Sequence, residues 1–203
     1  MTPTKALSKY DEFRTLARSK TVLEQFAMVL GNGAGAYVSI VITAVGNSDD
    51  LKKCTTSSIL MSAMRAATLK LSVDPGIGQA YLVPYKDKAT LIVGYKGLYA
   101  MALRTGKYRY LNVSRICEGQ DVQLEQMRGI HTIVGSPISK TVLGYLLYFE
   151  LTSGFSKTFY MTVPELWAHA DQYSASWKYN KAKSFWTTQP DMMMAKTVMR
   201  LGL

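Results

Sequence analysis

The sequence predicts an α+β fold, in which a small antiparallel sheet has helices packed on it. Segments with helical apolar spacing come first and last along the chain, and a further helical segment separates two groups of strand-like segments. The strand-like segments are joined by short turns, which favours antiparallel pairing. A parallel sheet would instead require strands and helices in regular alternation. The 203 residues suffice for one domain, or a domain with an arm, with a buried core.

The first third of the chain is expected to be mainly helical. Residues 1–18 have mixed charge and are expected to form a loose helix or an arm. Further helices are expected where apolar residues recur at helical spacing between capping residues and glycines. Ala34–Val45 is rich in β-branched residues, so a strand is an alternative there. The expected elements are helices at Val22–Leu30, Ala34–Val45 and Ile59–Leu71, with a loop at Asn47–Asp50.

The middle of the chain is expected to begin with a hairpin, after a tight turn at Asp74–Gly78. Ala80–Pro84 and Ala89–Val93 are the two predicted strands. A helix is expected over Gly94–Arg104, and Gly106 is a suitable residue to follow its end.

The second half is expected to add further antiparallel pairs and then two helices. Thr162, followed by a proline and a glutamate, has the pattern of a helix N-terminus. The expected elements are a hairpin of Tyr108–Glu118 with Val122–Met127, a loop at Gly129–Lys140, a pair of Thr141–Leu151 with Ser156–Met161, a helix from Thr162, a mobile basic stretch at Ser174–Ser184, and a last helix within Phe185–Leu203.

The charge of the chain points to a polyanionic partner. Lys and Arg number 24 against 14 Asp and Glu, which gives a formal net charge of +10. Cations are densest between Lys86 and Arg115, where Asp87 is the single acid and tyrosines are interleaved. Cations mixed with aromatic rings are typical of surfaces that hold phosphates and stack on bases. The cations of this region are Lys86, Lys88, Lys96, Arg104, Lys107, Arg109 and Arg115.

The residues that enzymatic or metal chemistry would need are sparse. The two cysteines and the two histidines do not have zinc-site spacing, and no glycine-rich segment has the spacing of a nucleotide site. Asp121 and Glu125 could share one face of a strand, as a metal-dependent nuclease would require, but a solvated hairpin edge is the favoured interpretation. The N-terminus lacks the apolar core of a signal peptide, and no apolar run is expected to span a bilayer. A cytoplasmic protein without a covalent catalytic site is therefore expected.

Three segments of the sequence resemble a known protein family. The segments that carry the resemblance are Leu51–Pro75, Gly78–Tyr108, with its motifs VPYK, GYKG and LRTG, and the ending W-x4-D-x4-K-T-V-x-R from Trp186 to Arg200. They are similar to the RecT family of phage and prophage single-strand annealing proteins, which are related to Redβ. The resemblance covers about residue 51 to the end, and more weakly the two helices before it.

The resemblance implies a function, an assembly and partners. Members of this family bind single-stranded DNA without ATP, anneal complementary strands, and assemble into rings or helical filaments. The implied partners are single-stranded DNA, the annealed duplex intermediate, further copies of the chain, a 5′→3′ exonuclease and the single-strand-binding protein of the bacterial host. Neither a nucleotide nor a resident metal is expected, with Mg²⁺ acting only as a counterion of DNA. By this resemblance, residues 1–50 would be an N-terminal helical arm for oligomerisation and residues 51–203 the annealing core, with the C-terminal partner-binding domain absent.

The resemblance also assigns DNA-binding residues. Most lie in the central motif, and the rest lie in the basic final helix and the tryptophan before it. Ala195 stands where many members carry a second lysine. The predicted DNA-binding residues are Lys86, Lys88, Tyr95, Lys96, Arg104, Lys107, Arg109, Trp186, Lys196 and Arg200. Two alternatives remain open at this point, a metal-dependent DNA-processing nuclease and a structural RNA-binding filament protein.

Overall fold

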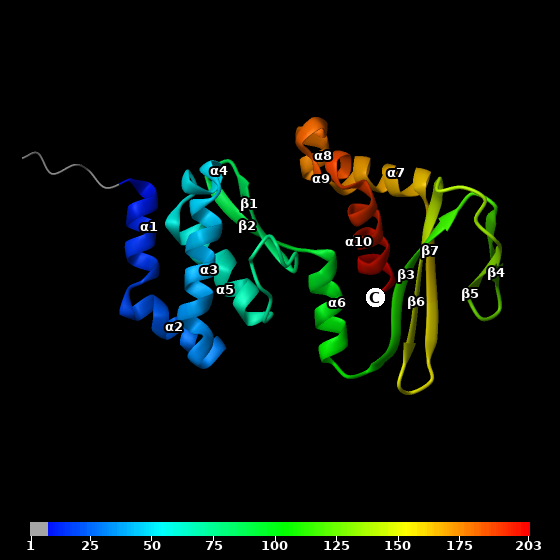
Figure 1. Cartoon of the computed structure of the whole chain (residues 1–203), viewed down its shortest axis with the longest axis horizontal. Helices are drawn as coiled ribbons and strands as arrows, with labels where there is room; N and C mark the ends of the chain where they lie inside the picture. The colour runs from blue at the N-terminus through cyan, green and yellow to red at the C-terminus, as the bar shows by residue number, and fades with distance from the viewer. Residues whose placement is uncertain (1–7) are drawn as a thin grey trace, which may run out of the picture. The chain divides into compact units, whose positions relative to one another are not determined.

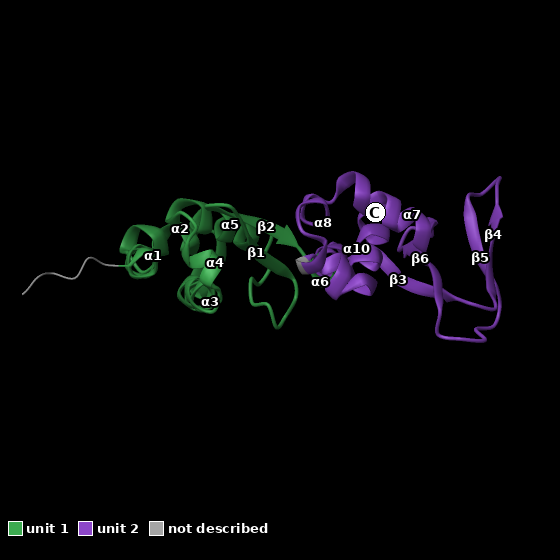
Figure 2. Cartoon of the chain, turned by 90° about the horizontal axis from the view of Figure 1, so that it is seen from above, with its two compact units in different colours: residues 1–97 green, residues 98–203 purple. Residues whose placement is uncertain are grey.

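The computed structural model describes residues 8–203, except for the side chain of Lys183, and confirms an α+β fold with small antiparallel sheets (Figure 1). The chain forms two compact units, residues 1–97 and 98–203, which are coloured separately in Figure 2. The helix Thr56–Thr68 packs against the two N-terminal helices, and the predicted arm of residues 1–50 with a core of residues 51–203 stays a prediction. The first seven residues of the predicted arm lie outside the described part of the chain.

Unit 1 combines a group of helices with one hairpin. The predicted helices and the predicted hairpin are confirmed, but part of the expected loop at Asn47–Asp50 is helical, because the Ser48 side chain caps a short helix there. Its elements are α1 (Lys9–Ala17), α2 (Lys20–Leu30), η1 (Gly31–Gly33), α3 (Ala34–Gly46), α4 (Asp49–Lys52), α5 (Thr56–Thr68), β1 (Ala80–Tyr85) and β2 (Lys88–Val93), followed by α6 (Tyr95–Arg104), which crosses into unit 2.

The core of unit 1 lies between its helices. Phe13, Phe26, Val41 and Ile59 are almost completely buried. The Tyr37 hydroxyl donates hydrogen bonds to main-chain carbonyls of α5 and of the segment after it, and burial raises the pKa of Tyr37. A buried tyrosine with a satisfied hydroxyl ties α3 to α5 without leaving a polar group unpaired.

The two predicted helices α2 and α3, with η1 between them, form one long apolar stretch from Lys20 to Gly46. Helices α2 and α3 are joined by the short turn η1, where Gly31 has a φ of 56°, and the 27 residues together are long and apolar enough to cross a membrane by length and composition alone. The expectation that no apolar run spans a bilayer is not overturned by this one stretch, because length and composition alone are weak evidence. Core helices of soluble proteins meet the same criterion, and here α2 packs against α3 and α5.

Unit 2 contains a three-stranded antiparallel sheet in the order β3-β6-β7 and a separate β4-β5 hairpin. The predicted pairing of β3 with β4 was wrong, since β3 pairs with β6, and the expected loop at Gly129–Lys140 contains a strand. Its elements are β3 (Tyr108–Cys117), β4 (Gln120–Glu125), β5 (Ile130–Gly135), β6 (Val142–Leu151), β7 (Ser156–Thr162), α7 (Val163–Tyr173), α8 (Ala175–Tyr179), η2 (Lys181–Lys183), α9 (Phe185–Thr188) and α10 (Pro190–Gly202).

The sheet of unit 2 has different neighbours on its two faces. Leu147 of β6 is fully buried on the face that meets α10, where a Cβ atom on Gly202 would overlap its side chain. The β4-β5 hairpin contacts the other face, because the main-chain N–H of His131 donates to the Thr158 hydroxyl of β7 at 2.7 Å. Figure 1 shows α10 and the β4-β5 hairpin on opposite sides of the sheet.

The C-terminal region is more broken into short helices than predicted. Part of the stretch Ser174–Ser184 forms α8 and η2, and the expected last helix is divided into α9 and α10. Pro190 causes this division, since proline restricts the residue before it and is favoured in the first turn of a new helix. The capping box predicted at Thr162 is present, with Glu165 as its acidic partner.

Candidate nucleic-acid interface

The tip of the β1-β2 hairpin presents two exposed cations. Lys86 lies in the turn with a φ of 56°, and Lys88 begins β2. The turn is anchored from outside the hairpin, because the main-chain N–H of Thr55 donates to the carbonyl of Asp87 at 2.8 Å. Among the described residues, neither lysine forms an ion pair, although Asp87 stands between them in the sequence. Both positive charges are therefore available to a phosphate.

The GYKG motif fixes the start of α6 against the turn before β1. Gly94 donates its main-chain N–H to the carbonyl of Gln79 at 2.8 Å. A Cβ atom on Gly94 would overlap the carbonyl oxygen of Gly78, and one on Gly97 would overlap that of Gln79. Both glycines are therefore required by close approach of the backbone. Lys96 lies between them, is exposed, and is held on a firmly packed turn of helix.

The second half of α6 and the start of β3 carry two more of the predicted cations. Arg104 and Lys107 are exposed on either side of Gly106, whose φ of 66° reverses the chain. The backbone of Lys107 is held in place, because its carbonyl accepts from the main-chain N–H of Thr152 at 2.8 Å. Tyr95, at the first position of α6, is half-buried. Its burial favours a packing role for the ring over a freely exposed stacking surface.

Two arginines of the central region have carboxylate partners that are distant in sequence. Arg109 Nη1 lies 2.7 Å from Glu150 Oε1, and the Tyr148 hydroxyl donates to the other oxygen of the same carboxylate. Arg115 Nη2 lies 2.7 Å from Asp191 Oδ2. Arg109 forms an ion pair between β3 and β6, and its DNA contact stays a prediction. The predicted excess of positive charge over Lys86–Arg115 is smaller than the local sequence indicates.

The last helix presents Lys196 and Arg200 one turn apart. Arg200 is exposed and Lys196 is half-buried. Burial, followed by the positive charge of Arg200, lowers the pKa of Lys196 to about 8. Within residues 8–203, neither side chain forms an ion pair. This arrangement keeps two like charges together without a counter-charge. An anionic ligand would relieve the repulsion between them.

Trp186 is the predicted site residue that the structure places inside the protein. Its side chain is only 2% exposed, and its ring centroid lies 5.6 Å from that of Trp167. A ring in this position packs in the hydrophobic core and does not reach a base. The predicted role of Trp186 in DNA binding is thus corrected to a role in the fold.

The two carboxylates considered for a nuclease lie on β4. Asp121 and Glu125 are exposed there, and Glu125 is 3.7 Å from Arg128. Within the described part of the chain, no group of three His, Cys, Asp or Glu side chains is placed to hold a metal ion. The structure therefore gives the nuclease alternative no added support.

The remaining predicted site residues fall into groups that belong to different elements. In unit 1 these are the hairpin turn and the first turn of α6. In unit 2 they are the end of α6 with the start of β3, and the α10 face. The groups are Lys86 and Lys88, Tyr95 and Lys96, Arg104 and Lys107, and Lys196 and Arg200. Local sequence patterns did not reveal the structural role of Gly94 and Gly97 or the acidic partners Glu150 and Asp191.

An α+β scaffold with unpaired, exposed cations on several elements defines a candidate polyanion-binding protein. Comparison with known proteins specifies the class: the chain belongs to the RecT family, whose model matches residues 35–203. It is 35% identical over 189 residues to the uncharacterized protein YqaK of Bacillus subtilis. The aligned region covers 93% of this chain and 64% of that protein. It is also 25% identical over 130 residues to Protein RecT of Escherichia coli. That aligned region covers 59% of this chain and 48% of that protein.

Proposed function

We propose that this protein binds single-stranded DNA and anneals complementary strands during recombination, without a nucleotide cofactor and without covalent catalysis. The observation that carries the proposal is the set of exposed cations without ion-pair partners in a member of the RecT family, Lys86, Lys88 and Lys96 in unit 1 and Lys107 in unit 2. Both relatives are longer than the matched region, so activity and partners are assigned here by inference. The proposed site of action is the cytoplasm of a bacterial host.

The proposed mechanism depends on phosphate contacts. Cations that neutralise backbone phosphates release condensed counterions and reduce repulsion between two strands. Contacts of this kind do not read base identity, so the bases stay available for pairing. Base pairing then supplies the driving force, and the protein raises the local concentration of the strands. Mg²⁺ would take part only as a counterion of DNA.

An annealing assay tests the proposal directly. Complementary oligonucleotides of which one carries a fluorophore and the other a quencher are mixed with protein in the absence of any nucleotide. We expect duplex to form much faster than without protein, and equally fast when ATP is added. Equal rates with and without protein would refute annealing. Preferential binding of single-stranded RNA over DNA of the same sequence would favour the alternative of an RNA-binding filament protein.

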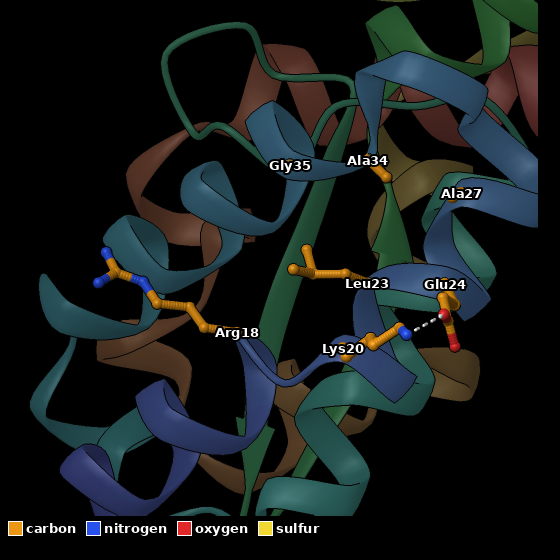
Figure 3. Close-up of a pocket in the computed structure, with 7 residues that line it drawn as sticks. All are labelled: Arg18, Lys20, Leu23, Glu24, Ala27, Ala34 and Gly35. Carbon is orange, nitrogen blue, oxygen red and sulfur yellow. Dashed lines mark ion pairs between the residues drawn. The ribbon is translucent and has the colours of Figure 1, made fainter.

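We further propose that unit 1 supplies a contact between copies of the chain. Met28 on α2 is 86% exposed and is the one exposed large apolar side chain between Lys20 and Gly46. A shallow depression of about 470 Å³ is lined by Leu23, Ala27, Ala34 and Gly35 and by the charged residues Arg18, Lys20 and Glu24, the last two of which form an ion pair (Figure 3). Uncovered apolar surface of this kind marks protein interfaces. The exonuclease and the host single-strand-binding protein remain proposed partners on the basis of the family alone.

Replacing Met28 with Glu is expected to shift the protein toward smaller species, because a charge in an apolar contact must be desolvated without a partner. Sedimentation velocity at several protein concentrations measures the shift, and we expect at least about a tenfold weaker association. Met127→Glu is the matched control, since Met127 is 95% exposed in unit 2. An unchanged distribution for Met28→Glu would place the contact between copies elsewhere.

A further inference from the structure

The side chain of Lys196 is a cation that the fold exposes only in part and does not neutralise. Its residue is half-buried on α10, and no hydrogen bond or ion pair to it occurs among the described residues. Within the same residues no buried side-chain nitrogen or oxygen lacks a partner, so the Lys196 amine must reach the surface. A mostly buried stem with its charged end at the surface is a fixed, partly desolvated positive charge.

His169 on α7 belongs to the same region. Helices α7 and α10 pack against each other, and the positive charge of Arg200 acts on both His169 and Lys196. His169 is half-buried, and its ring lies 4.7 Å from that of Tyr173, one turn along α7. Burial and the charge of Arg200 both lower the pKa of His169. His169 is therefore close enough to Arg200 to feel its charge, and Arg200 stands one turn along α10 from Lys196.

The carboxylates of α7 and of the elements that contact it are engaged by other groups. Glu165 accepts hydrogen bonds within the Thr162 cap, and Asp171 accepts from Trp177 Nε1 at 2.7 Å. Asp191 and Glu150 are paired with arginines of β3. The charged and titratable side chains on α7 and on the elements that contact it are Glu165, Asp171, Tyr173, Tyr145, Tyr148, Glu150, Lys157, Tyr160, Lys178, Tyr179, Asp191, Lys196 and Arg200.

We propose that His169 joins Lys196 and Arg200 in one phosphate-binding cluster, and that a backbone phosphate of single-stranded DNA is its ligand. This inference rests on the proposed function and adds a residue and a regulation to it. An anion placed between these groups relieves the repulsion of Lys196 by Arg200 and favours the protonated form of His169. Binding of the strand therefore takes up a proton at His169, and affinity rises as the pH falls from 7.5 to 5.5.

The two histidines of the chain make this proton uptake directly measurable. Their Cε1–H signals are followed by NMR as a function of pH, with and without a short oligothymidine, whose bases do not titrate in this range. The pKa of His169 is expected to rise by about one unit when the strand binds. His131, whose Nδ1 lies 3.0 Å from the Thr158 hydroxyl of β7, is the internal control and should not respond. A bound strand that leaves the pKa of His169 unchanged would overturn the proposal.

The substitution His169→Gln keeps a polar side chain of similar size but removes the titrating group. In the unsubstituted protein, affinity for oligothymidine is expected to increase as the pH falls from 7.5 to 5.5. The increase is up to about tenfold for each unit by which strand binding raises the pKa of His169. In His169→Gln this increase should disappear, whereas His131→Gln should retain it. Retention of the pH dependence in His169→Gln would contradict the proposal.

Two further arms separate the possible causes. Inorganic phosphate at the same total phosphate concentration is expected to shift the His169 signal much less than the strand does, and an equal shift would overturn the assignment to a strand phosphate. Failure of the unsubstituted protein to bind oligothymidine at any pH would instead refute the proposed function. Binding with normal affinity but without pH dependence would refute only the role of His169.

Discussion

Replacing Lys196 with Met is expected to make the protein more stable and to weaken its binding to single-stranded DNA. The pKa of Lys196 is lowered to about 8 by burial and by Arg200, so its charged form is disfavoured in the folded state at neutral pH. A shift from 10.5 to about 8 corresponds to at most about 3 kcal/mol of unfavourable free energy at pH 7. Methionine fills similar space without a charge and removes this cost, while one phosphate contact is lost, which we expect to weaken binding about fivefold.

The effect of Lys196→Met on stability depends on pH, and its sign follows from the lowered pKa of Lys196. Because the unfolded state holds the proton more tightly than the folded state, the free energy of unfolding contributed by Lys196 rises between about pH 8 and 10.5. The stability advantage of Lys196→Met is therefore full below pH 8 and vanishes by about pH 10.5. The raised pKa values of Tyr37 and Tyr145 oppose this trend above pH 10 in both proteins, so the difference between them is the quantity to compare.

Urea denaturation followed by tryptophan fluorescence measures this difference in the relevant unit, because Trp167, Trp177 and Trp186 all lie in unit 2. Lys178→Met is the control, since Lys178 is exposed on α8 and its substitution should change stability by less than about 0.5 kcal/mol. If Lys196→Met is less stable than the unsubstituted protein at pH 7, the lysine stem stabilises the fold and the charge does not strain it.

Replacing Gly97 with Ala is expected to destabilise unit 1 by about 3 kcal/mol. The added Cβ atom would overlap the main-chain carbonyl oxygen of Gln79, and a backbone atom cannot move aside as a flexible side chain can. The start of α6 would have to shift, which would also displace Lys96. The gain in helix propensity from glycine to alanine, about 1 kcal/mol, does not offset this overlap.

Gly35→Ala is the matched control for this substitution. Gly35 lies in α3, and a Cβ atom there would meet no other atom within 4 Å, so we expect a neutral effect or a gain of up to about 1 kcal/mol. Far-UV circular dichroism during denaturation measures both variants, because unit 1 is mainly helical. Equal stability of Gly97→Ala and the unsubstituted protein would show that the GYKG glycines are not required for packing.

Local patterns were sufficient for most of the fold. Helices α2, α3, α5 and α6, the β1-β2 hairpin and the β6-β7 pair follow from periodicity, caps and turns, all of which act within a few residues. The pairing of β3 with β6 could not be found in this way, since sequence neighbours are the default expectation for strands. The ten-residue strands β3 and β6 begin 34 residues apart, at Tyr108 and Val142, and both contact α10, so their pairing depends on tertiary packing.

The candidate site was less predictable than the fold, because charge pairing is a tertiary property. Arg109 and its partner Glu150 are 41 residues apart, and Arg115 and Asp191 are 76 residues apart. A count of charges along Lys86–Arg115 contains no information on such partners. Trp186 shows the same limit for aromatic residues, since the family resemblance assigned it to DNA binding but its ring packs in the core.

The most direct test is the dependence of single-stranded DNA affinity on salt, in a variant that carries Lys86→Gln, Lys88→Gln and Lys96→Gln. Each phosphate contact to a single strand contributes about −0.7 to the slope of log affinity against log salt concentration. If these three exposed cations bind phosphates, the slope should become less negative by about 2, whereas Arg115→Gln, which removes an ion-paired cation, should leave it nearly unchanged. A slope for the triple variant equal to that of the unsubstituted protein would show that the hairpin and the start of α6 do not hold the strand.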